Sequence, residues 1–116
     1  MQGKRADRVS HLIQMELSDL ILRRLKDPRL GFVTVTHVDI TADLKSARVF
    51  YSVMGSDKVK ADSHAALEHA TGFLQSKVGA VLQLRYTPRL TFIVDNSLDR
   101  GMEIDRVLRD IHKEKS

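Results

Sequence analysis

The chain has 116 residues, neither cysteine nor tryptophan, and 19 Lys plus Arg against 15 Asp plus Glu, which gives a formal net charge of +4 at pH 7. A chain of this length can bury one hydrophobic core, so we expect a single domain over residues 1–116. The lack of cysteine excludes disulfides and thiolate metal sites. No stretch has the apolar character of a signal peptide or the length of a membrane span, so we expect a cytoplasmic protein with no membrane partner.

Basic charge is in excess, with a sequence pI near 9.6. Such an excess fits a polyanionic partner, although many soluble proteins with similar charge have none. Aromatic residues make up only 5% of the chain, so stacking surfaces for bases are scarce. If the partner is a nucleic acid, this composition favours recognition of backbone and shape over base stacking.

The first half of the chain predicts a helix followed by two strands. Residues 4–25 carry one apolar stripe at helical spacing, made of Val9, Leu12, Ile13, Leu17, Leu20 and Ile21. The segment 26–31 contains a proline and a glycine, which end the helix and turn the chain. Residues 32–40 are rich in β-branched residues but lose their alternation near His37, which predicts either a strand buried on both faces or a bulge. Residues 47–53 alternate regularly and are close enough in sequence to complete a hairpin.

The stretch 62–84 predicts two helical segments joined at Ala70, Thr71 and Gly72. Glycine is a poor helix former, so we place a kink at Gly72. A core-facing stripe is expected after this joint, made of Phe73, Leu74, Val78, Val81 and Leu82.

The last part of the chain predicts one strand and one helix. Residues 90–95 alternate in the manner of a strand and follow Pro88, which restricts them to an edge or to a strand start. A final helix is expected from about Met102, with residues 109–116 frayed. The resulting order is helix, strand, strand, kinked helix pair, strand, helix. It predicts an α+β fold in which the helices pack on one face of a three-stranded mixed sheet.

Histidine is the residue type that could most readily support catalysis here. His64 and His69 lie on one helix but about 140° apart around its axis, so they cannot share a metal ion as an i, i+4 pair does. His37 and Asp39 share one side of a strand, yet no motif places a serine or cysteine nucleophile beside them. We therefore expect no catalytic residues, no metal, no cofactor and no small-molecule substrate.

Basic residues are the candidates for binding. Three of them, Lys77, Arg85 and Arg89, lie between Glu68 and Asp95 in a stretch without any acidic residue. A phosphate backbone is attracted most strongly where no carboxylate competes for the cations. The full candidate set for phosphate contact adds residues from the first helix and from in and just before the second strand: Lys4, Arg5, Arg8, Lys45 and Arg48.

The predicted order of elements resembles a KH RNA-binding domain, and the helix and strand in front give it the bacterial, type II, arrangement. In ordinary KH domains a Gly-x-x-Gly loop joins the two helices and clamps the nucleic-acid backbone. Here that joint is Ala70-Thr71-Gly72. Together with the motifs at residues 26–31, 88–97 and 101–104, the joint makes the chain resemble the ribosome-binding factor A family from about Arg5 to Leu108.

The resemblance implies a ribosome assembly factor of the bacterial cytoplasm. Members of that family bind the free or immature small ribosomal subunit and its rRNA. They support late maturation, including 5′-end processing of the precursor small-subunit rRNA, and they are linked to growth in the cold. They are not enzymes, and we expect this chain to act as a monomer. From the residues alone two alternatives stay open: a generic KH-like binder of single-stranded RNA or DNA, and a protein-interaction domain.

Overall fold

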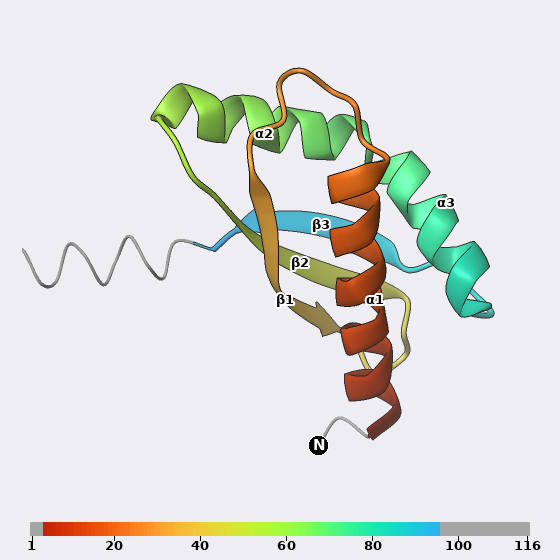
Figure 1. Cartoon of the computed structure of the whole chain (residues 1–116). Coiled ribbons are helices and arrows are strands. Elements are labelled where there is room, and N and C mark those ends of the chain that lie inside the picture. The colour runs from red at the N-terminus through yellow and green to blue at the C-terminus, as the bar shows by residue number, and fades with distance from the viewer. Residues whose placement is uncertain (1–3, 96–116) are drawn as a thin grey trace, which may run out of the picture.

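The computed structural model describes residues 4–95. In chain order it contains α1 (Lys4–Arg23), β1 (Val33–Ile40), β2 (Ser46–Val53), α2 (Asp57–His69), α3 (Thr71–Leu82) and β3 (Arg89–Val94) (Figure 1). This order confirms the predicted one as far as the third strand. The expected final helix from Met102 and the frayed residues 109–116 lie outside the described residues.

The three strands form one mixed sheet in the order β1-β2-β3. β1 pairs antiparallel with β2, and the register shifts between Val35 and His37, so the irregularity expected near His37 is a bulge in the ladder. β3 runs parallel to β2, beginning with Arg89 opposite Ser46. Parallel neighbours cannot be joined by a tight turn, and α2 and α3 supply the crossover between them.

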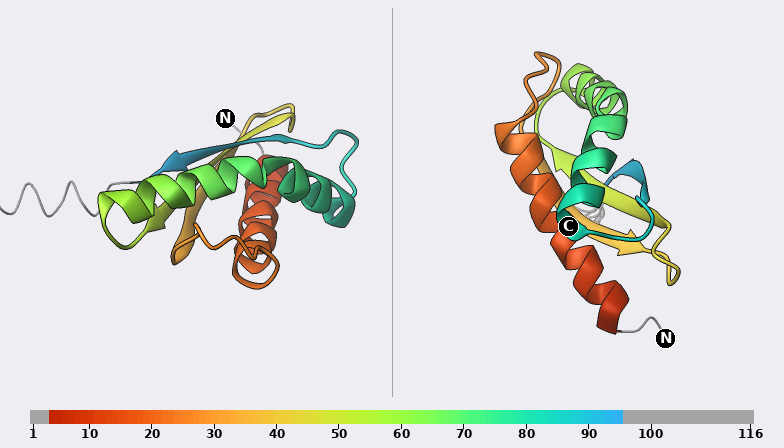
Figure 2. Two further views of the ribbon diagram at one scale, coloured as in Figure 1. Left: turned by 90° about the horizontal axis from the view of Figure 1, so that it is seen from above. Right: turned by 90° about the vertical axis from the view of Figure 1, so that its right-hand side faces the viewer.

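All three helices lie against one face of the sheet, as predicted (Figure 2). Along β2 every second residue is buried and the residues between them face outward. The core between helices and sheet is built from α1, α3 and β2 side chains that are fully buried, including Ile13, Leu17, Leu74, Val78, Val49 and Tyr51. The α+β class and the one-sided packing therefore follow the alternation and the helical stripes in the sequence.

Two helical stripes differ in detail from the prediction. In α1 the expected stripe is buried except for Leu12. In α3 Leu74 and Val78 are buried, but Phe73 is 40% exposed and Val81 57% exposed, so placing these two in the core was wrong. They lie on the same side of α3, away from Gln75, whose side-chain oxygen accepts a hydrogen bond from the Leu90 N–H at 2.9 Å.

The bend between α2 and α3 lies at Ala70. This residue ends α2 and precedes α3 with φ −86° and ψ −1°, and the Thr71 hydroxyl donates to the Leu67 carbonyl at 3.0 Å. Gly72 lies inside α3, its φ is not positive, and a Cβ built on it would meet nothing within 4 Å. The predicted bend in the Ala70–Gly72 joint is present, but its attribution to Gly72 was wrong, because neither the backbone nor the packing requires glycine there.

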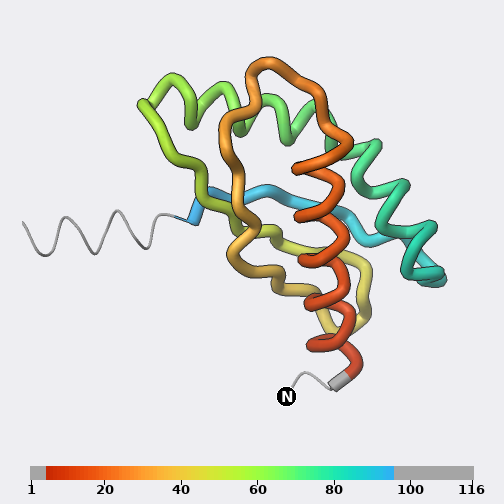
Figure 3. Tube along the Cα trace, viewed as in Figure 1, coloured from red at the N-terminus to blue at the C-terminus, as the bar shows by residue number. Residues whose placement is uncertain are grey.

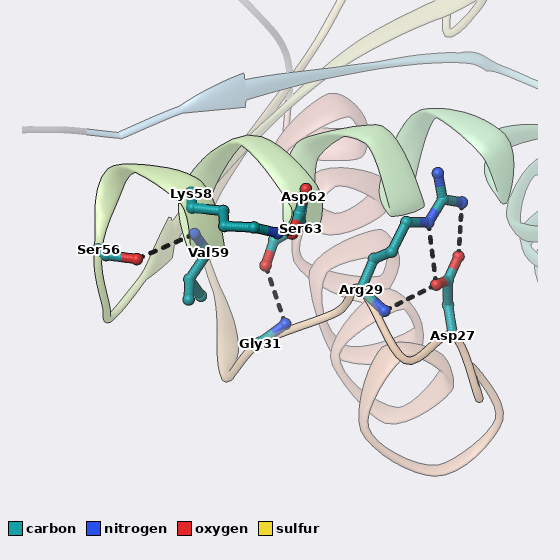
Figure 4. Close-up of polar contacts among 8 residues, drawn as sticks. All are labelled: Asp27, Arg29, Gly31, Ser56, Lys58, Val59, Asp62 and Ser63. Carbon is teal, nitrogen blue, oxygen red and sulfur yellow. Dashed lines mark hydrogen bonds and ion pairs between the residues drawn. The ribbon is translucent and has the colours of Figure 1, made fainter.

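Polar contacts within the turn after α1 shape it, and one hydrogen bond from its backbone attaches it to α2 (Figure 4). Asp27 Oδ1 accepts from the Arg29 backbone N–H at 2.9 Å, and Asp27 Oδ2 lies 2.7 Å from Arg29 Nη2. These hydrogen bonds from Arg29 lower the pKa of the Asp27 carboxyl to about 2. The Gly31 N–H donates to Ser63 Oγ at 2.8 Å, and a Cβ on Gly31 would lie 2.8 Å from Val59 Cγ1. Gly31 is thus required by the close approach of the turn to α2.

A chain of three side chains joins β2 to α2. Tyr51 is fully buried, its hydroxyl lies 2.6 Å from His64 Nδ1, and His64 Nε2 lies 2.8 Å from Glu68 Oε1. An ionised carboxylate can only accept, so His64 Nε2 is the donor to Glu68, and Nδ1 can accept from the tyrosine hydroxyl. Burial raises the pKa of Tyr51 to about 12. The arrangement satisfies the polar groups of a buried tyrosine and positions α2 on the sheet.

We predict that Gly72→Ala stabilises the fold by several tenths to about 1 kcal/mol, because alanine is the better helix former and its methyl group meets no atom. The same substitution at Gly31 should destabilise it by about 1–3 kcal/mol, because Val59, Ser63 and the strand beside them would have to move. Urea unfolding of both variants measures the two free energies. A destabilised Gly72→Ala protein would show that the joint does depend on glycine.

Acid should weaken the turn after α1. Because the pKa of Asp27 is lowered in the folded state, its contribution is complete above about pH 4, the range of an unfolded aspartate, and is lost as the pH falls towards 2. Asp27→Asn and Arg29→Gln should therefore both show a smaller fall in melting temperature between pH 5 and pH 2.5 than the parent chain. If the melting temperature of either variant falls as much as that of the parent chain, the Asp27–Arg29 interaction is not the source of the acid sensitivity.

Candidate nucleic-acid interface

One end of the molecule gathers three segments that are far apart in sequence. The start of α1, the turn between β1 and β2, and the segment between α3 and β3, which can be followed along the chain trace in Figure 3, all contribute residues to one pocket there. Between them lies a cavity of about 430 Å³, here called the hairpin-end pocket. Its lining consists of Arg5, Ala6, Ala42, Asp43, Leu44, Leu84, Arg85 and Tyr86.

Cations surround this pocket. Arg5 and Arg85 belong to its lining. Lys45 Nζ and Arg85 Cζ lie 5.0 Å and 5.4 Å from the centre of the Tyr86 ring. Arg89 begins β3, where its backbone N–H donates to the Lys45 carbonyl at 2.8 Å, but its exposed side chain is not part of the pocket lining. Within residues 4–95 none of these four cations takes part in a salt bridge, so their charges are available to an external anion.

Asp43 is the carboxylate in the lining of the pocket. Its Oδ1 accepts from the Thr41 hydroxyl at 2.6 Å and from the Lys45 backbone N–H at 3.0 Å. These hydrogen bonds lower the pKa of Asp43, so it is ionised at neutral pH and shapes the turn between β1 and β2. With Arg5, Lys45 and Arg85 against it, the positive charge still exceeds the negative charge around the pocket.

The remaining residues predicted to bind RNA are not part of the pocket lining. Arg48 lies on the helix-free face of the sheet, where Nη2 is 2.5 Å from Asp39 Oδ2. Lys77 lies on α3 with its Nζ 5.7 Å from the centre of the Phe73 ring. Arg8 is exposed on α1, one turn after Arg5, and Lys4 is the first residue of that helix. The Ala70–Gly72 joint is at the opposite end of α3 from the pocket. The structure thus brings Arg5, Lys45 and Arg85 together at the pocket, and leaves Arg48, Arg89, Lys77 and the joint outside its lining.

Three residues of this site were missed from the sequence. Tyr86 was not singled out, although it stands beside Arg85 in the acid-free stretch. Leu44 and Gln83 have φ of 62° and 50°, and they are the only non-glycine residues in the described part with positive φ. Both adjoin the pocket, Leu44 as lining and Gln83 immediately before Leu84. No sequence signal marks either residue, because neither is a type that favours the left-handed region.

The described residues form no centre for metal chemistry, since no group of three or more His, Asp or Glu side chains could hold an ion within residues 4–95. No helix in that part of the chain is long and apolar enough to cross a membrane.

Fold and pocket together define a small α+β domain of KH-like architecture with an exposed cationic site. The family model of ribosome-binding factor A matches residues 5–108. A relative of that name from Syntrophus aciditrophicus is 43% identical over 114 residues, which cover 98% of this chain and 93% of the relative. The chain therefore belongs to the ribosome-binding factor A family.

Solved structures of that family share the fold. The solution structure of a Thermotoga maritima protein described as a putative ribosome binding factor A has a TM-score of 0.69 and 29% identity, and covers 78% of this chain and 86% of its own. A homology model of the Thermus thermophilus ribosome binding factor A, fitted into a cryo-electron microscopy map of a 30S–RbfA complex, has a TM-score of 0.62 and 25% identity. That match covers 76% of this chain and 96% of the Thermus chain.

The two ends of α1 allow a charge-matched test of the pocket. Arg5→Gln with Arg85→Gln removes two cations at the pocket, and Arg23→Gln with Arg24→Gln removes two at the other end of α1. If the pocket cations contact phosphates, the first pair should weaken binding to small ribosomal subunits and lower the log–log salt slope by about 0.7–0.9 for each phosphate that is no longer neutralised. The second pair should leave the slope nearly unchanged. Equal slopes for both double variants, measured by filter binding at several salt concentrations, would reject the pocket as the phosphate site.

Proposed function

We propose that this chain binds the free or immature small ribosomal subunit through its rRNA and supports late maturation of that subunit, including 5′-end processing of the precursor rRNA. The proposal is supported by membership of the ribosome-binding factor A family and by the 30S–RbfA complex into whose map the homology model of the Thermus relative was fitted. The observation that carries it is the group of cations around the hairpin-end pocket, which have no salt-bridge partner within residues 4–95.

The geometry favours recognition of a folded RNA. Arg5, Lys45 and Arg85 come from three separate segments that are fixed by the core, so their spacing is set before any ligand arrives. A preformed set of cations matches phosphates held at a similar fixed spacing, as in an rRNA junction, better than those of a mobile single strand. The chain then acts as a cytoplasmic, monomeric binding protein and the RNA is cut by separate nucleases.

A catalytic role has little support within residues 4–95. The side-chain relay of this region, Tyr51–His64–Glu68, begins at a fully buried tyrosine, and each member is satisfied by its neighbour. Lowering the pKa of a nucleophile would suit catalysis, but burial raises that of Tyr51. This network is the kind that stabilises a core.

Fractionation of a cell extract on a density gradient tests the proposal. An assembly factor must leave before translation begins, so the protein should co-sediment with free small subunits and be nearly absent from translating ribosomes. A strain without it should accumulate small-subunit rRNA with an unprocessed 5′ end. Equal occupancy of translating ribosomes, or equally tight binding to arbitrary short RNAs, would favour a generic single-strand binder instead.

A further inference from the structure

Tyr86 is an exposed aromatic residue that the fold itself does not explain. It is 51% exposed and lies outside the hydrophobic core cluster. Its hydroxyl makes no hydrogen bond to the part of the chain that the structure describes. Its ring instead lies beside Lys45 and Arg85 and forms part of the pocket lining. A half-exposed ring beside two cations offers a ligand both aromatic surface and positive charge.

The lining of the pocket is mixed in a way that suits a nucleotide. Leu44, Leu84 and two alanines contribute apolar surface next to the Tyr86 ring, while Arg5 and Arg85 contribute charge. A site for phosphate alone needs no apolar wall. The Asp43 carboxylate would repel a phosphate placed against it, whereas its Oδ2, which accepts no hydrogen bond within residues 4–95, can accept from a base N–H.

Backbone strain supports the same location. Leu44 and Gln83 hold left-handed conformations, which residues other than glycine rarely adopt. Leu44 places one apolar wall, and Gln83 turns the chain from α3 into the segment that carries Leu84, Arg85 and Tyr86. Strained residues that persist on both sides of one pocket indicate that its shape has a use.

We propose that the hairpin-end pocket takes one unpaired, unstacked nucleotide of RNA. The base lies against Tyr86 and the Arg85 guanidinium, with its edge towards Asp43, and the adjoining phosphate is held by Arg5 and Lys45. The proposal rests on the RNA-binding function above and adds a base-stacking contact to it. It places this contact at the end of α3 opposite the Ala70–Gly72 joint, so it does not depend on the loop that clamps nucleic acid in other KH domains.

The test uses the full chain and two RNA hairpins with the same stem. One hairpin carries a single bulged 2-aminopurine, and in the other that base is paired. Aromatic stacking on one base is worth about fivefold to a hundredfold in affinity. The parent chain should therefore bind the bulged hairpin tighter than the paired one by at least about fivefold, and the 2-aminopurine fluorescence should be quenched on binding.

Three variants identify the stacking ring. Tyr86→Leu should abolish the preference for the bulged over the paired hairpin, while Tyr86→Phe should keep that preference. Phe32→Leu is the matched control, since Phe32 is 69% exposed and stands just before β1, at the other end of the hairpin. Thermal melts confirm that each variant is folded.

Two results would overturn the nucleotide site: equal affinity of the parent chain for both hairpins, or a preference that survives Tyr86→Leu. In either case Tyr86 serves only to position the cations. Co-sedimentation with small subunits would still report separately on the proposed function, so failure of one proposal is distinguishable from failure of the other.

Discussion

The parallel pairing of β2 with β3 is the constraint on which the rest of this structure depends. β2 ends at Val53, and β3 must begin opposite Ser46 at the other end of the same strand. The connection therefore has to return along the sheet, a distance of about 26 Å for eight residues. At 1.5 Å per residue α2 and α3 together are about 38 Å long, so one straight helix would overshoot, and the bend at Ala70 fits the pair to the sheet.

The same constraint creates the site. Because the crossover has to deliver the chain next to Ser46, the segment after α3 arrives beside the turn between β1 and β2, where the Arg89 N–H bonds to the Lys45 carbonyl. The start of α1 lies at that end too, and Arg5 thereby meets Arg85, although eighty positions separate them in the sequence. The pocket is thus assembled from the ends of elements whose positions are already fixed by the core.

The sequence allowed the elements, their order and the one-sided packing to be predicted, because these follow from alternation and helical spacing within short windows. It did not allow the grouping of the basic residues to be predicted. The sequence prediction grouped Lys77 with Arg85 because both lie in the stretch without acidic residues. In the structure Arg85 instead lies near Arg5 and Lys45. The kink was assigned to Gly72 from residue type alone, while the backbone changes direction at Ala70. Such errors arise where tertiary contacts, rather than local preference, decide the outcome.

The net charge of +4 does not show where a polyanion would bind. The binding place depends on which cations are in salt bridges with carboxylates and which are not. Four aspartates each hold a cation elsewhere, in the pairs Asp19–Arg23, Asp27–Arg29, Asp39–Arg48 and Asp62–Lys58. Such exposed pairs add little stability, yet they neutralise the surfaces on which they lie. At the hairpin-end pocket the one lining carboxylate, Asp43, accepts hydrogen bonds from the turn between β1 and β2. The cations around the pocket are not in salt bridges within residues 4–95. We therefore propose that RNA phosphates are attracted to this end of the sheet, where the crossover delivers Tyr86.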